Sequence, residues 1–327
     1  MTAIERPRVT LIIPVRNEAA HIRACLDSVR KQSYPTERLE ILVVDGASTD
    51  VTPALVQDAA SVDPRVRLLE NPSRTMPTGL NLGIREAAGD LIGVVSGHSV
   101  LGPDYVERAV DAIETTQAWS VGGRIVRRTH GPMHRAIAIA TASPVGVGDS
   151  SHNYATEAGW VETVFPGFWR RQTFDRVGSF DPAMVANEDN ELSYRIRRAG
   201  GGIWYDPAIT VEYVPRSTIG GLFHQYRRYA MGKVRVFRKH GGGLRWRHLV
   251  PAAWLAFLVS GGILAAFSTV IALVWGTAGA AYLLAILVAS VRLAEDGVAW
   301  WRVAAALVTL HLAYGIGTWQ GVLTWRG

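Results

Sequence analysis

The sequence predicts an α/β protein with a mostly parallel, mixed β-sheet flanked by helices, followed by C-terminal transmembrane helices. Two observations predict the sheet. Short β-branched segments alternate with amphipathic helical segments over the first hundred residues, and the strand-like segments end in polar loops. A third observation predicts the membrane part, because the 43 residues 249–291 contain no charged side chain.

The strand-like segments of the first hundred residues are 9–15, 39–44, 66–69 and 91–95, each separated from the next by a helical pattern. Crossover helices of this length imply parallel pairing, and ligands of such sheets bind beyond the carboxyl ends of the strands. Further along, the pattern predicts a mixed region with strands at 120–127 and 159–164, a helix at 188–198 and short strands at 203–205 and 209–213.

The uncharged segment 249–291 is long enough for two membrane spans, since one span needs about 20 apolar residues. We place the turn between them at Trp275 and Gly276, because Trp favours the membrane interface and Gly tolerates turn geometry. Residues 303–323 predict a third span. The alternative, a long buried hairpin of a soluble protein, fits poorly because the run has no polar face.

Charge is divided unevenly along the chain. Residues 1–212 carry 22 Lys/Arg and 26 Asp/Glu, a net of −4, whereas residues 213–327 carry 12 and 2, a net of +10. Nine of these basic residues lie between Arg216 and Arg247, directly before the first predicted span. The excess of positive charge predicts that this side faces the cytoplasm and meets anionic membrane lipid.

These patterns divide the chain into three expected parts: a cytoplasmic α/β domain at 1–215, a basic amphipathic interfacial segment at 216–247, and a membrane domain of about three helices at 248–327. We therefore expect a multi-pass protein of the cell membrane. Cys25 is the single cysteine, which excludes an intrachain disulfide and agrees with a reducing compartment. Its amphipathic neighbourhood predicts a buried structural thiol.

Polar residues follow the first two strands, at 14–18 and 45–50. A carboxylate such as Asp45, followed by Gly and small hydroxyl residues, can accept hydrogen bonds from a base or a ribose while the backbone approaches closely. Alternatively, Asp45 caps the following helix. No G-x-G-x-x-G follows either strand, which argues against a dinucleotide site.

Several segments, in this order, resemble the inverting glycosyltransferases of family 2, with their GT-A, Rossmann-like nucleotide-diphospho-sugar fold. The resemblance covers residues 8–247 and is closest to the succinoglycan-biosynthesis branch, whose members extend sugars on a lipid-diphosphate carrier. The segments that carry it are VTLIIPVRNE (9–18), VVDGASTD (43–50), NPSR (71–74), GLNLGI (79–84), GD (89–90), NEDNEL (187–192) and QYRRY (225–229).

The resemblance implies that Asp45 binds the uracil or ribose of a UDP-sugar, with Pro14, Asn17 and Glu18 lining the same pocket. The family carries Asp-x-Asp at the end of the fourth strand, and the similar branch carries Asp-x-His, to hold a divalent cation on the diphosphate. This chain has Ser96-Gly97-His98 there, without the first carboxylate. His98 is then either one ligand of a weakly bound Mn²⁺ or Mg²⁺ or a direct donor to phosphate.

The resemblance also supplies the catalytic residues. In the family, the residue matching Asp189 is the general base that deprotonates the acceptor hydroxyl, and Glu188 would support the acceptor. The alternative is that both acids simply favour a helix N-terminus. Gln225, Arg228 and Tyr229 match the family's Gln-x-x-Arg-Trp with Tyr in place of Trp, so Arg228 would meet the departing diphosphate and Tyr229 the acceptor.

The resulting hypothesis is an enzyme that transfers a hexose, with glucose from UDP-glucose preferred, to a polyprenyl-diphosphate-linked saccharide in cell-surface polysaccharide or glycolipid synthesis. Two alternatives remain. A polyprenyl-phosphate sugar synthase attacks with a phosphate and needs no base, and a degenerate scaffold would bind sugar nucleotide or lipid without catalysis. Nucleic acid is not among the expected partners.

Overall fold

The computed structural model describes residues 5–148, 150, 153–184 and 186–324. The chain forms two compact units. The first contains the chain up to Arg127 together with Ala155–Val214, and the second contains Arg128–Tyr154 and the chain from Pro215 onward. The chain passes from the first unit to the second for the last time between Val214 and Pro215, and the earlier segment Arg128–Tyr154 also belongs to the second unit.

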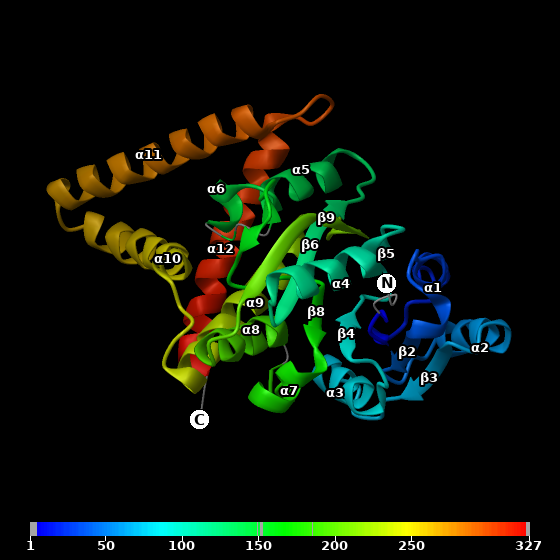
Figure 1. Ribbon diagram of the computed structural model, residues 1–327. Coiled ribbons are helices and arrows are strands. Elements are labelled where there is room, and N and C mark those ends of the chain that lie inside the picture. The colour runs from blue at the N-terminus through cyan, green and yellow to red at the C-terminus, as the bar shows by residue number, and fades with distance from the viewer. Residues whose placement is uncertain (1–4, 149, 151–152, 185, 325–327) are drawn as a thin grey trace. The chain divides into compact units, whose positions relative to one another are not determined.

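The first unit is built on one sheet (Figure 1), whose strands lie in the order β3-β2-β1-β4-β8-β6-β9-β5, with β7 paired to β9. β1, β2, β3 and β4 pair in parallel, whereas β8 is antiparallel to both β4 and β6, so the sheet is mixed as expected. The strands are β1 Val9–Val15, β2 Leu39–Asp45, β3 Val66–Glu70, β4 Leu91–Val94, β5 Val100–Leu101, β6 Ser120–Arg127, β7 Gly159–Trp160, β8 Gly167–Arg170 and β9 Ile203–Tyr213.

Both faces of the central strands β1 and β4 are buried, which explains why their sequences are almost continuously apolar. Leu11 and Ile13 of β1 face one hydrophobic cluster, and Ile12 between them faces the other. The first cluster includes residues of α1 Ile22–Arg30, α2 Thr52–Val62 and α4 Tyr105–Thr116. The second includes residues of α3 Met76–Glu86, α7 Arg171–Val177 and α8 Glu188–Arg198. A short 3₁₀ helix, η1 Thr36–Arg38, precedes β2.

The mixed half of the sheet differs from the prediction in two places. The strand expected at 159–164 is confined to Gly159–Trp160, and an unpredicted strand, Gly167–Arg170, lies between β4 and β6. Phe168 of that strand packs against Gly93, where a Cβ atom would come within 2.7 Å of the ring. The two short strands expected at 203–205 and 209–213 are one strand, β9, whose pairing with β6 shifts register between Gly123 and Arg124.

The second unit is helical. Its helices are α5 Pro132–Thr141, α6 Pro144–Val147, α9 Ile219–His240, α10 Trp246–Ala265, α11 Thr269–Leu293 and α12 Trp300–Thr324. Glycines let α12 approach α9 closely: a Cβ atom on Gly317 would lie 2.3 Å from the Arg227 carbonyl oxygen. Residues of α5, α9, α11 and α12 share a hydrophobic cluster, so α12 is partly buried against its neighbours.

The predicted turn at Trp275 and Gly276 is wrong. The bend between α10 and α11 falls at residues 266–268, and Trp275 lies inside α11. Ser268 begins the new helix by accepting a hydrogen bond from the Ile271 amide. The Trp275 indole instead packs against Gly261 of α10 and donates to the Leu258 carbonyl at 3.1 Å. Trp275 therefore holds the two helices together.

Two helices in the described part of the chain, α10 and α11, are long and apolar enough to cross a membrane by length and composition. The residues expected to form a third span do form a helix, α12. Several of its apolar side chains are buried in the cluster shared with α5 and α9, and it does not count among the candidate spans. Two apolar helices therefore suggest membrane association, and the third span stays a prediction.

Candidate active site

The carboxyl ends of β1, β2 and β4 lie at one edge of the sheet, because the three strands are parallel neighbours. β1 and β2 are in register to their last residues, where Val15 lies opposite Asp45. The backbone continues the contact beyond the strands, since the Gly46 amide donates to the Val15 carbonyl at 2.8 Å. Pro14, half-buried, lies opposite Val44. The three polar loops singled out in the sequence thus begin at the same edge.

Asp45 forms a tight turn with the residues that follow it. Its Oδ2 accepts from the Ser48 amide at 3.0 Å, and its Oδ1 accepts from the Ser48 hydroxyl. Asp45 does not cap the next helix, which was the alternative role. Instead, Asp50 accepts a hydrogen bond from the backbone amide of Thr52, the first residue of α2. Hydrogen bonding with Thr52 lowers the pKa of Asp50. Asp45 is mostly buried and faces its own loop.

Asn17 ties the loop after β1 to the loop after β2. Its backbone amide donates to the Ser48 hydroxyl at 2.8 Å, and its side-chain oxygen accepts from the Thr49 backbone amide at 2.8 Å. Both loops use left-handed backbone at a non-glycine residue, with φ of 56° at Asn17 and 55° at Ala47. Such conformations are costly and persist where surrounding bonds enforce them, as these do. The two loops therefore form one rigid wall.

Glu18 and His98 meet across the edge of the sheet, although they are 80 residues apart. Glu18 Oε1 lies 2.9 Å from His98 Nδ1, and the His98 ring packs against that of Tyr213 with the centroids 5.4 Å apart. Gly97 permits this approach, because a Cβ atom there would lie 2.7 Å from a Val15 methyl group. Pairing through Nδ1 leaves Nε2 as the His98 atom that can meet a ligand.

Ser96 and Cys25 lie beneath this loop. Ser96 is mostly buried, and its carbonyl oxygen accepts both from the Ser99 amide at 2.9 Å and from the Cys25 thiol at 3.5 Å. Burial raises the pKa of Cys25 to about 12, and the nearby Glu18 adds to the shift. Cys25 is fully buried, so the thiol stays protonated and supports the loop, as the sequence predicted.

The side chains at this edge offer too few metal ligands to hold a divalent cation without ligands from the substrate. Within residues 5–148, 150, 153–184 and 186–324, no three His, Cys, Asp or Glu side chains gather into a metal-binding group. Glu18 and His98 offer one carboxylate and one imidazole, whereas Mg²⁺ requires near-octahedral coordination. The expected Mn²⁺ or Mg²⁺ cofactor, with His98 as ligand, therefore stays a prediction.

Glu188 and Asp189 form the first turn of α8, whose cap residue Asn187 adopts left-handed backbone with φ of 62°. Both acids are half-buried, and Asp189 Oδ1 accepts from the Asn190 amide at 2.8 Å. This position suits the helix dipole, so the structural reading and the catalytic reading both remain compatible with it. The two acids belong to the same compact unit as Asp45 and His98.

Gln225, Arg228 and Tyr229 lie in the second unit, on α9. The Gln225 amide nitrogen donates to the Tyr229 hydroxyl at 2.9 Å, as residues four apart on a helix can. Tyr229 also packs against Tyr226, with ring centroids 5.5 Å apart, and it is 38% exposed. Arg228 is exposed. The motif thus presents a polar and aromatic helix surface.

Three residues to which the sequence analysis assigned no role make supporting contacts. The Asn71 backbone amide donates to the Asp45 backbone carbonyl at 2.8 Å. The Asn71 side chain donates to the Thr75 carbonyl, and the two bonds shape the loop after β3. Ser48 bonds to both Asp45 and Asn17. The fully buried Glu191 pairs with Arg195 on α8. The Glu-x-x-x-Arg spacing was the available signal for this last pair.

Comparisons with known proteins find sequence relatives along most of the chain. A sequence profile described as "Glycosyl transferase family 2" matches residues 10–170. The succinoglycan biosynthesis protein ExoA of Rhizobium meliloti (strain 1021) is 31% identical over 97% of this chain and 95% of its own length. A Methanococcus voltae protein named dolichyl N-acetyl-alpha-D-glucosaminyl phosphate 3-beta-D-2,3-diacetamido-2,3-dideoxy-beta-D-glucuronosyltransferase is 27% identical over 77% of this chain and 80% of its own.

A solved structure has the same fold along nearly the whole chain. The mannosyltransferase PcManGT from Pyrobaculum calidifontis, in complex with GDP-Man and Mn²⁺, superposes with a TM-score of 0.69. The match covers 99% of this chain and 89% of PcManGT at 22% identity. At that identity the likeness shows the fold alone, a GT-A-like mixed sheet with helices.

Proposed function

The chain belongs to glycosyltransferase family 2, and we propose that it is an inverting enzyme that moves a hexose from a UDP-sugar to a hydroxyl group of a lipid-linked saccharide. UDP-glucose is the proposed donor. The observation that carries the proposal is the rigid edge formed by Asp45, Asn17 and the Glu18–His98 pair, at the place where ligands of parallel sheets bind. The relative named for succinoglycan biosynthesis supports a role in polysaccharide synthesis, and the dolichyl phosphate in the other relative's name supports a lipid-linked acceptor.

The donor's nucleoside would lie against the wall formed by the loops after β1 and β2. Each carboxylate oxygen of Asp45 accepts from Ser48 and retains a second lone pair for the uracil or ribose. Pro14, Asn17 and Gly97 bring backbone close to the ligand. His98, fixed by Glu18, would direct Nε2 to the diphosphate, and Arg228 would donate a forked pair of hydrogen bonds to it.

The proposed reaction is a single displacement at the anomeric carbon. The acceptor hydroxyl oxygen attacks, the bond between the anomeric carbon and the diphosphate oxygen breaks, and UDP leaves from the opposite face with the bonding electrons. Asp189 takes the hydroxyl proton, and Glu188 holds the acceptor. One base suffices for this displacement, whereas a glycosidase requires two facing carboxylates. Tyr229 would stack on the acceptor sugar.

Two other functions make different predictions. A polyprenyl-phosphate sugar synthase would use a phosphate as nucleophile and would not depend on Asp189. A degenerate scaffold would bind a sugar nucleotide or lipid without turnover. The acidic first turn of α8 favours the first proposal over both, because it supplies a half-buried carboxylate that can serve as a general base.

The test is a donor screen with the full-length protein, using UDP-, GDP- and dTDP-sugars and native membrane extract as the acceptor. We expect transfer from a UDP-sugar. Asp189→Asn should leave donor binding nearly intact and lower turnover about 10²–10⁴-fold, as for the loss of a general base. Asp175→Asn, on exposed surface of α7, is the matched control and should behave as wild type.

The same screen separates the alternatives. Transfer to a polyprenyl phosphate that is insensitive to Asp189→Asn would identify a synthase. Nucleotide binding without turnover of any donor would identify a scaffold.

A further inference from the structure

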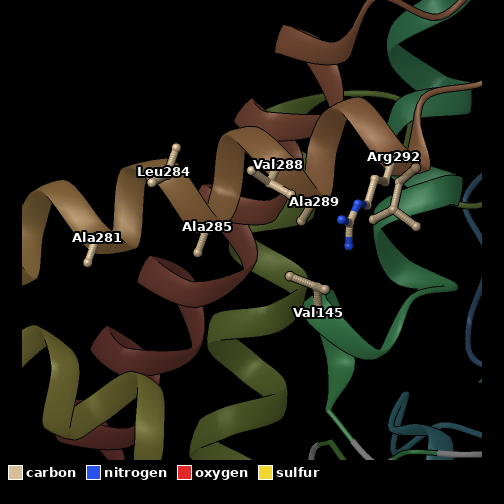
Figure 2. Close-up of a pocket in the computed structure, with 8 residues that line it drawn as sticks. Val145, Ala281, Leu284, Ala285, Val288, Ala289 and Arg292 are labelled. Carbon is tan, nitrogen blue, oxygen red and sulfur yellow. The ribbon is translucent and has the colours of Figure 1, made fainter.

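An apolar groove runs along α11 in the second unit. It has a volume of about 570 Å³ and lies between α11 and Val145 of α6 (Figure 2). Its α11 side is formed by Ala281, Leu284, Ala285 and Val288, which recur at helical spacing, and Arg292 lies at its end. From Ala281 to Arg292 the helix rises about 16 Å, at 1.5 Å per residue. The groove is therefore long, apolar and cationic at one end.

The Val145 wall is held in place by hydrogen bonds. The Val145 carbonyl lies 2.9 Å from His311 Nε2 of α12, and His311 Nδ1 lies 3.0 Å from the Tyr282 hydroxyl of α11. Gly146 lets this segment fit, because a Cβ atom there would lie 2.1 Å from the Ala140 carbonyl oxygen. One chain of polar contacts thus joins α6, α12 and α11, so the groove is a feature of the packed unit.

Arg292 is available to an anion at the end of the groove. The neighbouring acid Glu295 is already paired with Arg135 at 3.1 Å, and Arg135 also donates to the Asp296 carbonyl. Among the residues that the structure describes, no carboxylate lies within ion-pair distance of Arg292. Figure 2 shows its guanidinium extending from the end of α11 into the space beside Val145. The charge at this end therefore lacks a partner of opposite sign.

The position of Arg292 agrees with that of a lipid headgroup. α10 and α11 are antiparallel, since Trp275 contacts Leu258 and Tyr282 contacts Trp254. The start of α10, with Arg247, and the end of α11, with Arg292, therefore lie at the same end of the hairpin. Basic residues at one end of an apolar hairpin mark the membrane–water interface. The apolar part of the groove then extends from this interface toward the hydrocarbon.

We propose that this groove binds a polyprenyl phosphate lipid, with the isoprenyl chain along α11 and the phosphate on Arg292. Charge and shape together point to this ligand. An anionic group fits beside Arg292, and a long apolar chain fits beside Ala281 and Ala285. The proposal rests on the proposed function, because it gives the carrier of the lipid-linked acceptor its binding place. It goes further in naming the helix that recognises the carrier.

The test measures binding of a C55 isoprenyl phosphate to the full-length protein in nanodiscs by native mass spectrometry. Ala285→Trp fills the groove, and Arg292→Gln removes the charge while keeping a neutral polar side chain at that position. Each should lower lipid affinity about tenfold or more, since charge-assisted hydrogen bonds and shape are both lost. Leu283→Trp, on the exposed face of α11 opposite Ala285, and Arg302→Gln, whose guanidinium stacks on Trp301, are the matched controls and should bind as wild type.

Competition arms identify the ligand. Excess inorganic phosphate should leave the isoprenyl phosphate bound, and dioleoyl phosphatidylglycerol should displace it poorly. Equal weakening by Ala285→Trp and Leu283→Trp, unchanged binding in Arg292→Gln, or displacement by either competitor overturns the proposal. Sugar transfer to a lipid-linked acceptor without specific isoprenyl phosphate binding would overturn the lipid-binding proposal and leave the proposed function intact. Specific binding without any sugar transfer would overturn the proposed function alone.

Discussion

Replacing Glu191 by Gln should destabilise the first unit strongly, although the side chain touches neither strand-end loop. Glu191 is fully buried, and Arg195 clasps its carboxylate through Nε at 3.1 and 3.0 Å and through a terminal nitrogen at 2.7 Å. Arg195 also donates to the carbonyls of Val177, Gly178 and Ser179. This pair thus joins α8 to the end of α7.

The magnitude follows from leaving a mostly buried guanidinium without its anion. Removing one partner of a buried ion pair costs about 3–5 kcal/mol. Gln retains one acceptor oxygen and Arg195 is 17% exposed, so we expect the lower end, about 3 kcal/mol. At about 2–4 °C per kcal/mol, the melting temperature of the purified full-length protein should fall by roughly 6–12 °C. Turnover should fall as well, because α8 carries Asp189 on its first turn.

Glu162→Gln is the matched control. Glu162 lies 3.7 Å from Arg197, and the two side chains are 32% and 37% exposed. Removing this exposed charge should cost about 0–1 kcal/mol. The measurement is thermal unfolding of wild type and both variants in the same detergent. A shift for Glu191→Gln no larger than that for Glu162→Gln would refute the account of α8 anchoring.

Two further predictions concern metal and pH. Turnover should depend weakly on a divalent cation, with Mn²⁺ better than Mg²⁺ because Mn²⁺ accepts nitrogen ligands. Ser96→Asp should tighten the apparent metal affinity, as measured by titrating each ion against turnover. If His98→Ala titrates like the wild type at every metal concentration, His98 has only a structural role. Hydrogen bonding from Arg65 lowers the pKa of Asp63 to about 2, below its usual 3.8, so its stabilisation is complete above about pH 4 and is lost as the pH falls through 2. Asp63→Asn should therefore cost about 2 kcal/mol at pH 7, with a difference in unfolding free energy that shrinks below pH 4; a pH-independent difference would contradict this.

Local patterns predicted the elements that depend on local chemistry. The helix expected at 188–198 has those bounds, because its acidic first turn and basic last turn suit the helix dipole. The strand at 120–127 was also predicted as it stands. β8 was missed because its four residues follow Pro166 and carry no alternation, and its place in the sheet depends on partners far away in sequence.

The membrane helices show why apolar composition leaves boundaries open. Within 249–291 no position is charged, so no charge marks where the helix ends. Ser268 was the available signal, as a hydroxyl that could cap a new helix. Trp275 instead fills the contact with Gly261, which depends on the two helices being packed together. Composition likewise suggested a third span where α12 packs in the shared cluster.

The candidate site was predictable as a set of strand ends but not as a set of contacts. Parallel pairing places Pro14, Asp45 and Ser96 at one edge, and the sequence supplied that much. The order β2-β1-β4 then makes the loops after β1 and β4 neighbours, which no local pattern reveals. As a result Glu18, expected only to line the pocket, bonds to His98. The carboxylate that the family carries on the fourth strand is absent at Ser96, yet a carboxylate still stands beside His98 because the adjacent strand end provides it.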